Sequence, residues 1–157
     1  ESELVPYLEL IGKKELNLEI DIDKDLPELY ADVEKFKLLI SALIDNAVKF
    51  NERGGWLFIQ GRLREENGEE QLYLRVHNDG AHVPIEMADE IFAQYSQLGE
   101  INTEKPEGVG IGLALCRTIA EKMGGSIFLE DTGGVGTSFG LMLPLRMVYE
   151  DENNGLQ

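Results

Sequence analysis

EKFKLLISALIDNAVKF, the stretch from Glu34 to Phe50, predicts the long helix around which the rest of the fold is built. It contains neither Gly nor Pro, and most of its residues favour helix. Its apolar residues recur at three- and four-residue steps, and they are Phe36, Leu39, Ile40, Leu43, Ile44, Ala47, Val48 and Phe50. This period is typical of a helix buried on most of its circumference. Asp32 precedes it at a position suited to an N-cap.

Two polar residues interrupt this apolar surface near the end of the helix. At about 100° per residue, Ala42, Asn46 and Lys49 fall within about 60° of one another. Asn offers a carbonyl oxygen to a hard cation such as magnesium, and Lys meets a phosphate as a point charge. The alternative is a helix C-terminus with an incidental Asn and a solvated Lys, and this stretch alone leaves both interpretations open.

Length and composition exclude several classes of partner and of site. A chain of 157 residues with 43% hydrophobic content forms one domain with a real core. The net charge of −16 argues against nucleic acid or an anionic membrane surface as the main partner, so phosphate needs local geometry and a metal. One cysteine, Cys116, excludes an internal disulfide framework and a Cys-based zinc site. We expect a domain at 1–146 and an acidic, disordered tail at 147–157, cut from a longer protein.

The remaining pattern predicts short helices, one single strand and two hairpins. The expected elements are a helix at Leu4–Leu10, a strand at Glu15–Ile22, a hairpin of Trp56–Arg64 and Gln71–Asn78 through Asn67-Gly68, helices at Glu86–Ser96 and Leu113–Met123, and a hairpin of Ser126–Asp131 and Thr137–Leu145. This order predicts an α/β two-layer sandwich, with a mixed sheet of about five strands and three main helices on one face.

Alternation along the strand Gln71–Asn78 decides which polar residue reaches the interior. Leu72, Leu74 and Val76 lie on one face, and Asn78 continues that face. Asp79 does not. We therefore expect the side chain of Asn78, rather than that of Asp79, to enter the core side of the sheet.

GVGIGLAL, residues 108–115, is the sharpest local motif. Three glycines at alternate positions before a helix expose backbone N–H groups and present a positive helix end to an anion. A dinucleotide-binding motif requires a strand directly before it, and here an irregular stretch precedes it. A P-loop requires Gly-Lys-Ser/Thr, which is missing.

With its surroundings, the chain resembles the catalytic, ATP-binding domain of sensor histidine kinases, a Bergerat-fold family shared with gyrase, chaperone and mismatch-repair ATPases. LISALIDNAVKF is similar to the asparagine box, and VHNDGAHVP to the first glycine box. IFAQYSQ and GVGIGLAL are similar to the phenylalanine box and the second glycine box, and GTSF matches the small box of the last strand. The four main motifs occur in the family's order over about Leu16 to Leu145.

The resemblance implies ATP and magnesium, bound between the central helix and a mobile lid at Gln97–Glu107. Asn46 would be the magnesium ligand, Lys49 a phosphate contact, Asn78 the adenine-reading residue, and Thr137 its support. Further cofactor-binding positions would be Gly80, Lys105, Gly108, Gly110, Gly112 and Leu113. Lys105 is the only cation in the lid sequence and would be a second phosphate contact.

Three residues depart from the family pattern. Asn78 stands where an Asp is usual, and a carboxamide that accepts the adenine proton needs an acceptor for its own NH₂. From the sequence, Asp at this position would bind ATP a few-fold tighter, because charged acceptors are stronger. His82 replaces a second glycine and would stiffen the base end of the pocket or partly fill it. Gln97 replaces a frequent Arg, which weakens the expected phosphate clamp.

The resemblance implies a histidine protein kinase of two-component signalling that lacks its phospho-acceptor domain here. It would present the γ-phosphate to a histidine on a separate dimerisation domain, and through that domain serve a response regulator in the cytoplasm. We expect no nucleic acid partner and no direct membrane contact by this domain. The alternative is a degenerate nucleotide-binding domain that acts by docking to a protein. An ATP-hydrolysing machine is disfavoured by Ala42, which replaces the glutamate base of such enzymes.

Overall fold

A computed structural model describes residues 2–27, 32–93 and 111–145. Its strands are β1 (Asn17–Ile22), β2 (Trp56–Glu66), β3 (Glu69–Asn78), β4 (Ser126–Glu130) and β5 (Thr137–Pro144). Its helices are η1 (Ser2–Tyr7), α1 (Leu8–Lys13), α2 (Val33–Lys49), η2 (Ile85–Met87), α3 (Ala88–Ala93) and α5 (Ile111–Lys122), where η marks a 3-10 helix.

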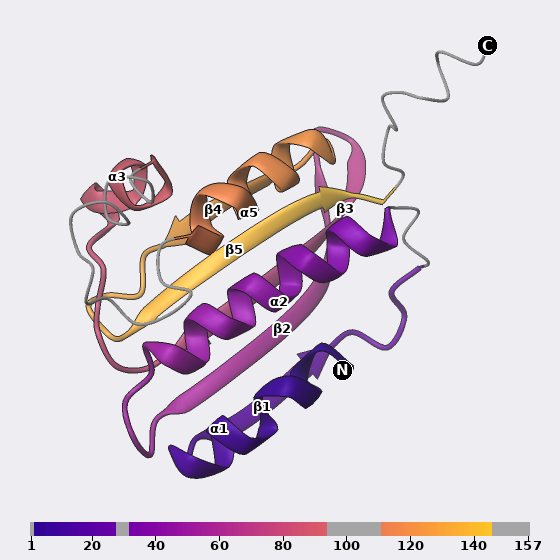
Figure 1. The fold of residues 1–157 in the computed structure, drawn as a ribbon. Helices are drawn as coiled ribbons and strands as arrows, with labels where there is room; N and C mark the ends of the chain where they lie inside the picture. Colours follow the sequence, from indigo (N-terminus) through magenta and orange to yellow (C-terminus); the bar gives the residue numbers. More distant parts are fainter. Residues whose placement is uncertain (1, 28–31, 94–110, 146–157) are drawn as a thin grey trace.

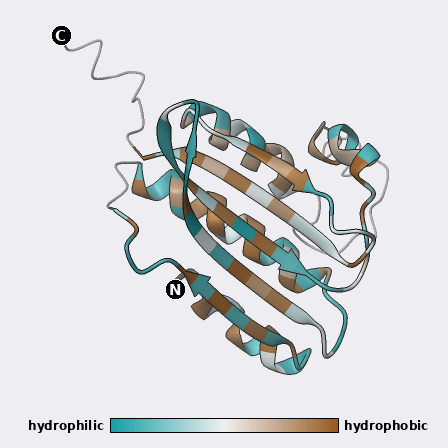
Figure 2. Cartoon of the chain, turned by 180° about the vertical axis from the view of Figure 1, so that it is seen from behind, coloured by the Kyte–Doolittle hydropathy of each residue, from teal (hydrophilic) through white to brown (hydrophobic). Residues whose placement is uncertain are grey.

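The strands form one mixed sheet in the order β1-β2-β3-β5-β4. β1 pairs with β2 in parallel, and the other neighbours are antiparallel. α1, α2 and α5 lie on one face of this sheet (Figure 1). The opposite face, seen in Figure 2, carries no helix within the described parts of the chain. The predicted two-layer α/β sandwich is confirmed.

α2 is the central helix that the sequence predicts. The Asp32 carboxylate accepts hydrogen bonds from the backbone N–H groups of Glu34 and Lys35, which confirms the N-cap. The helix buries five apolar side chains against the sheet and the other helices: Leu39, Leu43, Ile44, Ala47 and Val48. Phe50, expected on the same stripe, is the helix C-cap and is exposed. The apolar stripe therefore ends one turn earlier than its period predicts.

The other elements differ from the prediction mainly at their ends. The first predicted helix is a 3-10 turn followed by α1, and β1 begins only at Asn17 because Glu15 adopts a positive φ of 56°. The hairpin turn is confirmed, since Asn67 and Gly68 have the positive φ values, 55° and 80°, that its tight turn requires. Of the predicted helix Glu86–Ser96, the described part is η2 followed by α3.

No helix in the described ranges is both long enough and apolar enough to cross a lipid bilayer.

Candidate functional site

The ends of β3 and β5 bring two sequence-predicted site residues together. Asn78 is 2% exposed and pairs across the sheet with Leu57 on one side and Thr137 on the other. Leu57 is fully buried, and Thr137 is also buried. Asn78 therefore lies on the helix-covered face, as the alternation along β3 predicts.

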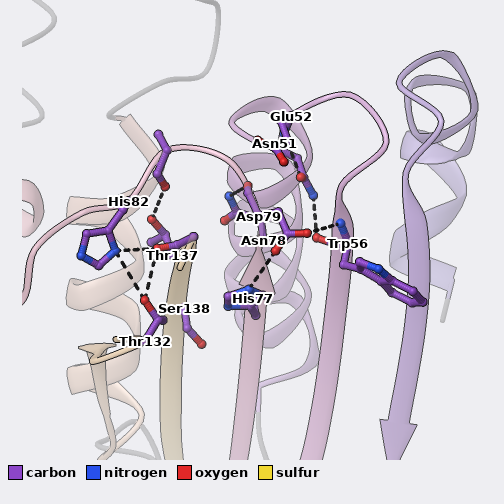
Figure 3. A network of polar contacts seen from close by, with 12 residues as sticks. Asn51, Glu52, Trp56, His77, Asn78, Asp79, His82, Thr132, Thr137 and Ser138 are labelled. Atoms are coloured by element: carbon purple, nitrogen blue, oxygen red, sulfur yellow. Dashed lines mark hydrogen bonds and ion pairs between the residues drawn. The ribbon is translucent and has the colours of Figure 1, made fainter. Parts of the chain in front are cut away.

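The hydrogen bonds of this pair orient their oxygens (Figure 3). Asn78 Nδ2 donates to the backbone oxygen of Asp79 at 2.7 Å. Thr137 Oγ1 donates to the backbone oxygen of Ala81, also at 2.7 Å. The acceptor that the Asn78 NH₂ group needs is thus supplied by the next residue. The carboxamide oxygen of Asn78 makes none of the hydrogen bonds found among the described residues, so it remains available as an acceptor.

The Asp79 side chain, unlike that of Asn78, binds the backbone of a neighbouring strand. Its Oδ2 accepts from the backbone N–H of Trp56 at 2.8 Å, and its own N–H donates to the Trp56 oxygen at 3.2 Å. Its Oδ1 lies 3.4 Å from His77 Nε2. Asp79 therefore ties the end of β3 to the start of β2, and it leaves the interior face to Asn78.

His77 is buried on the far face of the sheet beside Phe58, with a ring-centroid separation of 6.0 Å. Burial lowers the pKa of His77, although the Asp79 carboxylate opposes that shift. Its Nδ1 is a buried atom with no hydrogen-bond partner in the described structure. The imidazole is therefore held neutral, with Nε2–H donating towards Asp79.

Gly80 allows α2 and the first glycine box to meet. Its φ is 104°, and a Cβ there would lie 2.6 Å from the backbone oxygen of Phe50, at the end of α2. Only glycine combines that backbone conformation with so close an approach. Gly80 thus fixes the distance between the helix that carries Asn46 and the strand end that carries Asn78.

His82 connects the loop of the first glycine box to a neighbouring turn. Its side chain is exposed, and its Nδ1 lies 2.8 Å from the backbone oxygen of Gly136, to which it donates as the Nδ1–H tautomer. Thr132 Oγ1 lies 3.4 Å from both the His82 Nδ1 and the Gly136 oxygen. The histidine therefore links the glycine-box loop to the turn between β4 and β5 (Figure 3).

α2 carries the other predicted residues on its last two turns. Asn46 is half-buried, and its side chain has no hydrogen bond to the described residues. Lys49 Nζ lies 3.3 Å from Asp45 Oδ1, an ion pair one turn apart. A Cβ on Gly112, near the start of α5, would lie 3.4 Å from Ala42 Cβ. The second glycine box therefore approaches α2 one turn before Asn46. The Asn46 carboxamide, which makes no hydrogen bond to the described residues, has an oxygen suited to a hard cation.

Several predicted residues lie outside the described parts of the chain. They are Lys105, Gly108, Gly110, Gln97 and the rest of the predicted lid up to Glu107. From the phenylalanine box, Phe92 is 5% exposed and packs edge-to-face on Phe139 at 5.7 Å. Leu113 is partly buried against the core.

Three contacts near the site were not predicted from the sequence. The Asp45–Lys49 pair has the i,i+4 spacing of helical ion pairs, so the sequence contained its signal. Lys14 donates to carbonyl groups at the end of α2, and Asn51 Nδ2 donates to the Trp56 oxygen at 2.8 Å. The Lys14 contacts join residues more than thirty positions apart, and no local pattern indicates them.

Comparison with known proteins identifies the family. The profile of the HATPase_c family, described as histidine kinase-, DNA gyrase B- and HSP90-like ATPase, matches residues 31–147. The chain belongs to this ATPase family. The matched range includes α2, both strand ends of the candidate site and the second glycine box.

Its relatives are sensor kinases. The chain is 33% identical over 131 residues to the sensor histidine kinase AruS of Pseudomonas aeruginosa, which covers 83% of this chain and 13% of AruS. It is 32% identical over 139 residues to the adaptive-response sensory kinase SasA of Crocosphaera subtropica, covering 88% of this chain and 35% of SasA. The chain thus spans about a third or less of the length of these relatives.

A solved structure agrees with the sequence relatives. The catalytic domain of histidine kinase ThkA, in a nucleotide-free form, superposes with a TM-score of 0.75 at 25% identity. The match covers 92% of this chain and 89% of that domain. The fold is therefore that of a histidine kinase catalytic domain.

Proposed function

We propose that this chain is the ATP-binding catalytic domain of a sensor histidine kinase, which binds ATP with magnesium and presents the γ-phosphate to a histidine on a separate dimerisation domain. The observation that carries the proposal is the oriented acceptor at Asn78. Its NH₂ group is engaged by the Asp79 oxygen, so the carboxamide oxygen is left to accept the adenine amino proton. The named kinase relatives support the same assignment.

The adenine end of the proposed pocket consists of Asn78 and Thr137. Thr137 donates its hydroxyl proton to Ala81, which leaves the oxygen of the hydroxyl as an acceptor towards the base. Gly80 keeps the loop close to α2. In this arrangement both side chains are held by the loop before the base arrives, so less freedom is lost on binding.

The phosphate end lies along α2 and the second glycine box. The Asn46 oxygen would coordinate magnesium, which would neutralise phosphate charge when bound. Lys49 would contact a phosphate, with the neighbouring Asp45 orienting its ammonium group. The backbone at Gly108, Gly110, Gly112 and Leu113, together with Lys105 of the lid sequence, would complete the phosphate contacts.

Ala42 bears on whether this domain hydrolyses bound ATP. It offers no general base one turn before Asn46, so this domain would hold ATP for transfer and would not hydrolyse it. The acceptor histidine would belong to the dimerisation domain of the same protein, and the response regulator would receive the phosphoryl group from that histidine in the cytoplasm. In this proposal residues 1–146 act as the domain and residues 147–157 as an acidic tail.

A docking module that binds nucleotide weakly or not at all is the second candidate, motivated by Asn78, His82 and Gln97. Isothermal titration of this chain with ADP, ATP and GTP in excess magnesium distinguishes the two. The kinase assignment predicts saturable binding of the adenine nucleotides and much weaker binding of GTP, whose base has a carbonyl at the position of the amino group. No binding of any nucleotide by the folded protein would favour the docking module.

A further inference from the structure

We propose that Lys14 is a positioning residue for nucleotide binding, which holds the end of α2 and thereby the side chains of Asn46 and Lys49. The inference rests on the proposed function, because it assigns those side chains to the metal and phosphate. Lys14 follows α1 directly, and thus lies outside the motifs that carry the family resemblance.

The ammonium group of Lys14 donates hydrogen bonds at the C-terminal end of α2. Its Nζ donates to the backbone oxygens of Val48 at 2.9 Å, Lys49 at 2.8 Å and Asn51 at 3.2 Å. An ammonium has three N–H donors, and the last carbonyls of a helix lack partners within it. A cation at this end also interacts favourably with the helix dipole. The three donors of Lys14 therefore bind two carbonyls that α2 leaves open and one in the loop that follows.

The end that Lys14 holds is the functional end of the helix. Asn46 and Lys49 lie on the last turn, and the final helical hydrogen bond runs from Phe50 N–H to the Asn46 oxygen at 3.1 Å. With the Val48 and Lys49 oxygens bound to one charged group, this turn has less freedom to unwind. Loss of the Lys14 ammonium would let the Asn46 carboxamide and the Lys49 side chain move.

The Lys14 ammonium is also linked to the proposed adenine site through the loop that follows α2. Asn51, whose oxygen binds Lys14, is buried, and its Nδ2 donates to the Trp56 oxygen (Figure 3). The Trp56 N–H binds the Asp79 carboxylate, next to Asn78. A continuous series of hydrogen bonds therefore runs from Lys14 to the proposed adenine acceptor.

Backbone contacts should keep a Lys14 variant folded. Gly54 N–H donates to the Lys14 oxygen at 2.9 Å, and Asn17 N–H donates to the Gly55 oxygen at 2.8 Å. Neither bond involves the ammonium group. The contact between the turn after α1 and the loop after α2 can thus persist without the lysine side chain, while the end of α2 loses its three donors.

Chemical rescue tests the inference. Lys14→Cys removes the ammonium, and alkylation of the new thiol with 2-bromoethylamine restores a nearly isosteric ammonium side chain. The native thiol does not interfere, because Cys116 is 1% exposed and burial raises its pKa to about 12, which leaves it as an unreactive thiol. Lys13→Cys is the matched control, since Lys13 is exposed, adjacent and of equal charge.

Calorimetric Kd values for ADP with magnesium are compared at a temperature where circular dichroism shows every protein fully folded. We expect Lys14→Cys to raise Kd about tenfold, with alkylation restoring it to within about twofold, because three charge-assisted hydrogen bonds are lost and regained. Lys13→Cys should change Kd by less than about twofold, as expected for an exposed charge. If Lys14→Cys does not fold, Lys14→Arg replaces it and should give a smaller but measurable rise.

A lower melting temperature with an unchanged Kd would overturn the inference, since Lys14 would then be only a structural cap. Equal effects at Lys13 and Lys14 would overturn it as well, because net charge alone would explain them. Wild-type protein that binds no nucleotide would refute the proposed function, and this inference with it. If wild type binds nucleotide normally and the Kd of Lys14→Cys, or of Lys14→Arg in its place, is unchanged, this inference alone is refuted.

Discussion

Asn78→Asp replaces the proposed adenine acceptor by the residue that is usual in the family, and the structure predicts that it weakens binding. From the sequence alone, a carboxylate is the better acceptor and would bind ATP more tightly. In the structure, the Asn78 NH₂ group donates to the Asp79 oxygen at 2.7 Å. A carboxylate has no proton for that contact, so two oxygens would face each other at the end of β3.

The magnitude follows from three contributions. The charged acceptor gains about 1 kcal/mol over the neutral one, taking typical hydrogen bonds to charged and neutral groups. The lost bond to Asp79 costs about 0.5–1.5 kcal/mol, and leaving buried oxygens without a donor costs about 1–3 kcal/mol more. The net loss is about 0.5–3.5 kcal/mol, which is roughly a twofold to several-hundredfold rise in Kd.

The assay is calorimetric titration of Asn78→Asp with ADP and magnesium, at pH 8 and at pH 6. Lower pH should partly restore affinity in this variant, because a protonated carboxyl can donate to the Asp79 oxygen. Asp79→Asn is the matched control. It keeps an oxygen for the Trp56 N–H and should change Kd by less than about threefold. Tighter binding by Asn78→Asp at pH 8 would refute the reasoning.

Three further predictions concern stability and turnover. Because burial holds the folded pKa of His77 below its unfolded value, its stabilising contribution is complete above about pH 6.5 and falls as pH drops through the folded pKa. Urea titrations between roughly pH 5 and pH 7 should show this loss in wild type and a shallower slope in His77→Gln, and equal slopes would contradict it. Gly80→Ala should cost about 1–3 kcal/mol of unfolding free energy, and more than Gly68→Ala, whose φ of 80° is also positive but whose Cβ would meet open space. The chain alone should hydrolyse ATP no faster than buffer, and a turnover on the order of one per second that disappears in Asn46→Ala would contradict the role given to Ala42.

Local patterns predict most of this fold because its elements have strong periods and clear ends. The apolar steps between Glu34 and Phe50 define α2, and two-residue alternation places Asn78 on the interior face. The Asn67-Gly68 turn follows from the positive φ that these residues tolerate. Each of these features depends on neighbours within a few residues of the chain, so the sequence alone predicts them.

Several of the hydrogen bonds that orient the site join distant parts of the chain, and the sequence did not predict them. Lys14 meets the end of α2 across more than thirty residues, and His82 meets Gly136 across more than fifty. The sequence places His82 at the adenine end of the expected pocket. It leaves open whether His82 stiffens that end or partly fills it. It also did not assign the Asn78 NH₂ group to its neighbour's carbonyl, because that contact depends on the backbone path after β3.

Magnesium-dependent nucleotide binding at Asn46 tests the account most directly. The Kd for ATP is measured by calorimetry with magnesium and with excess EDTA, for wild type and for Asn46→Ala, with circular dichroism as the check on folding. Wild type should bind at least about tenfold more tightly with magnesium, and the folded variant should lose that difference. A folded Asn46→Ala protein that keeps the full magnesium dependence would contradict the assignment of α2 as the metal-binding helix.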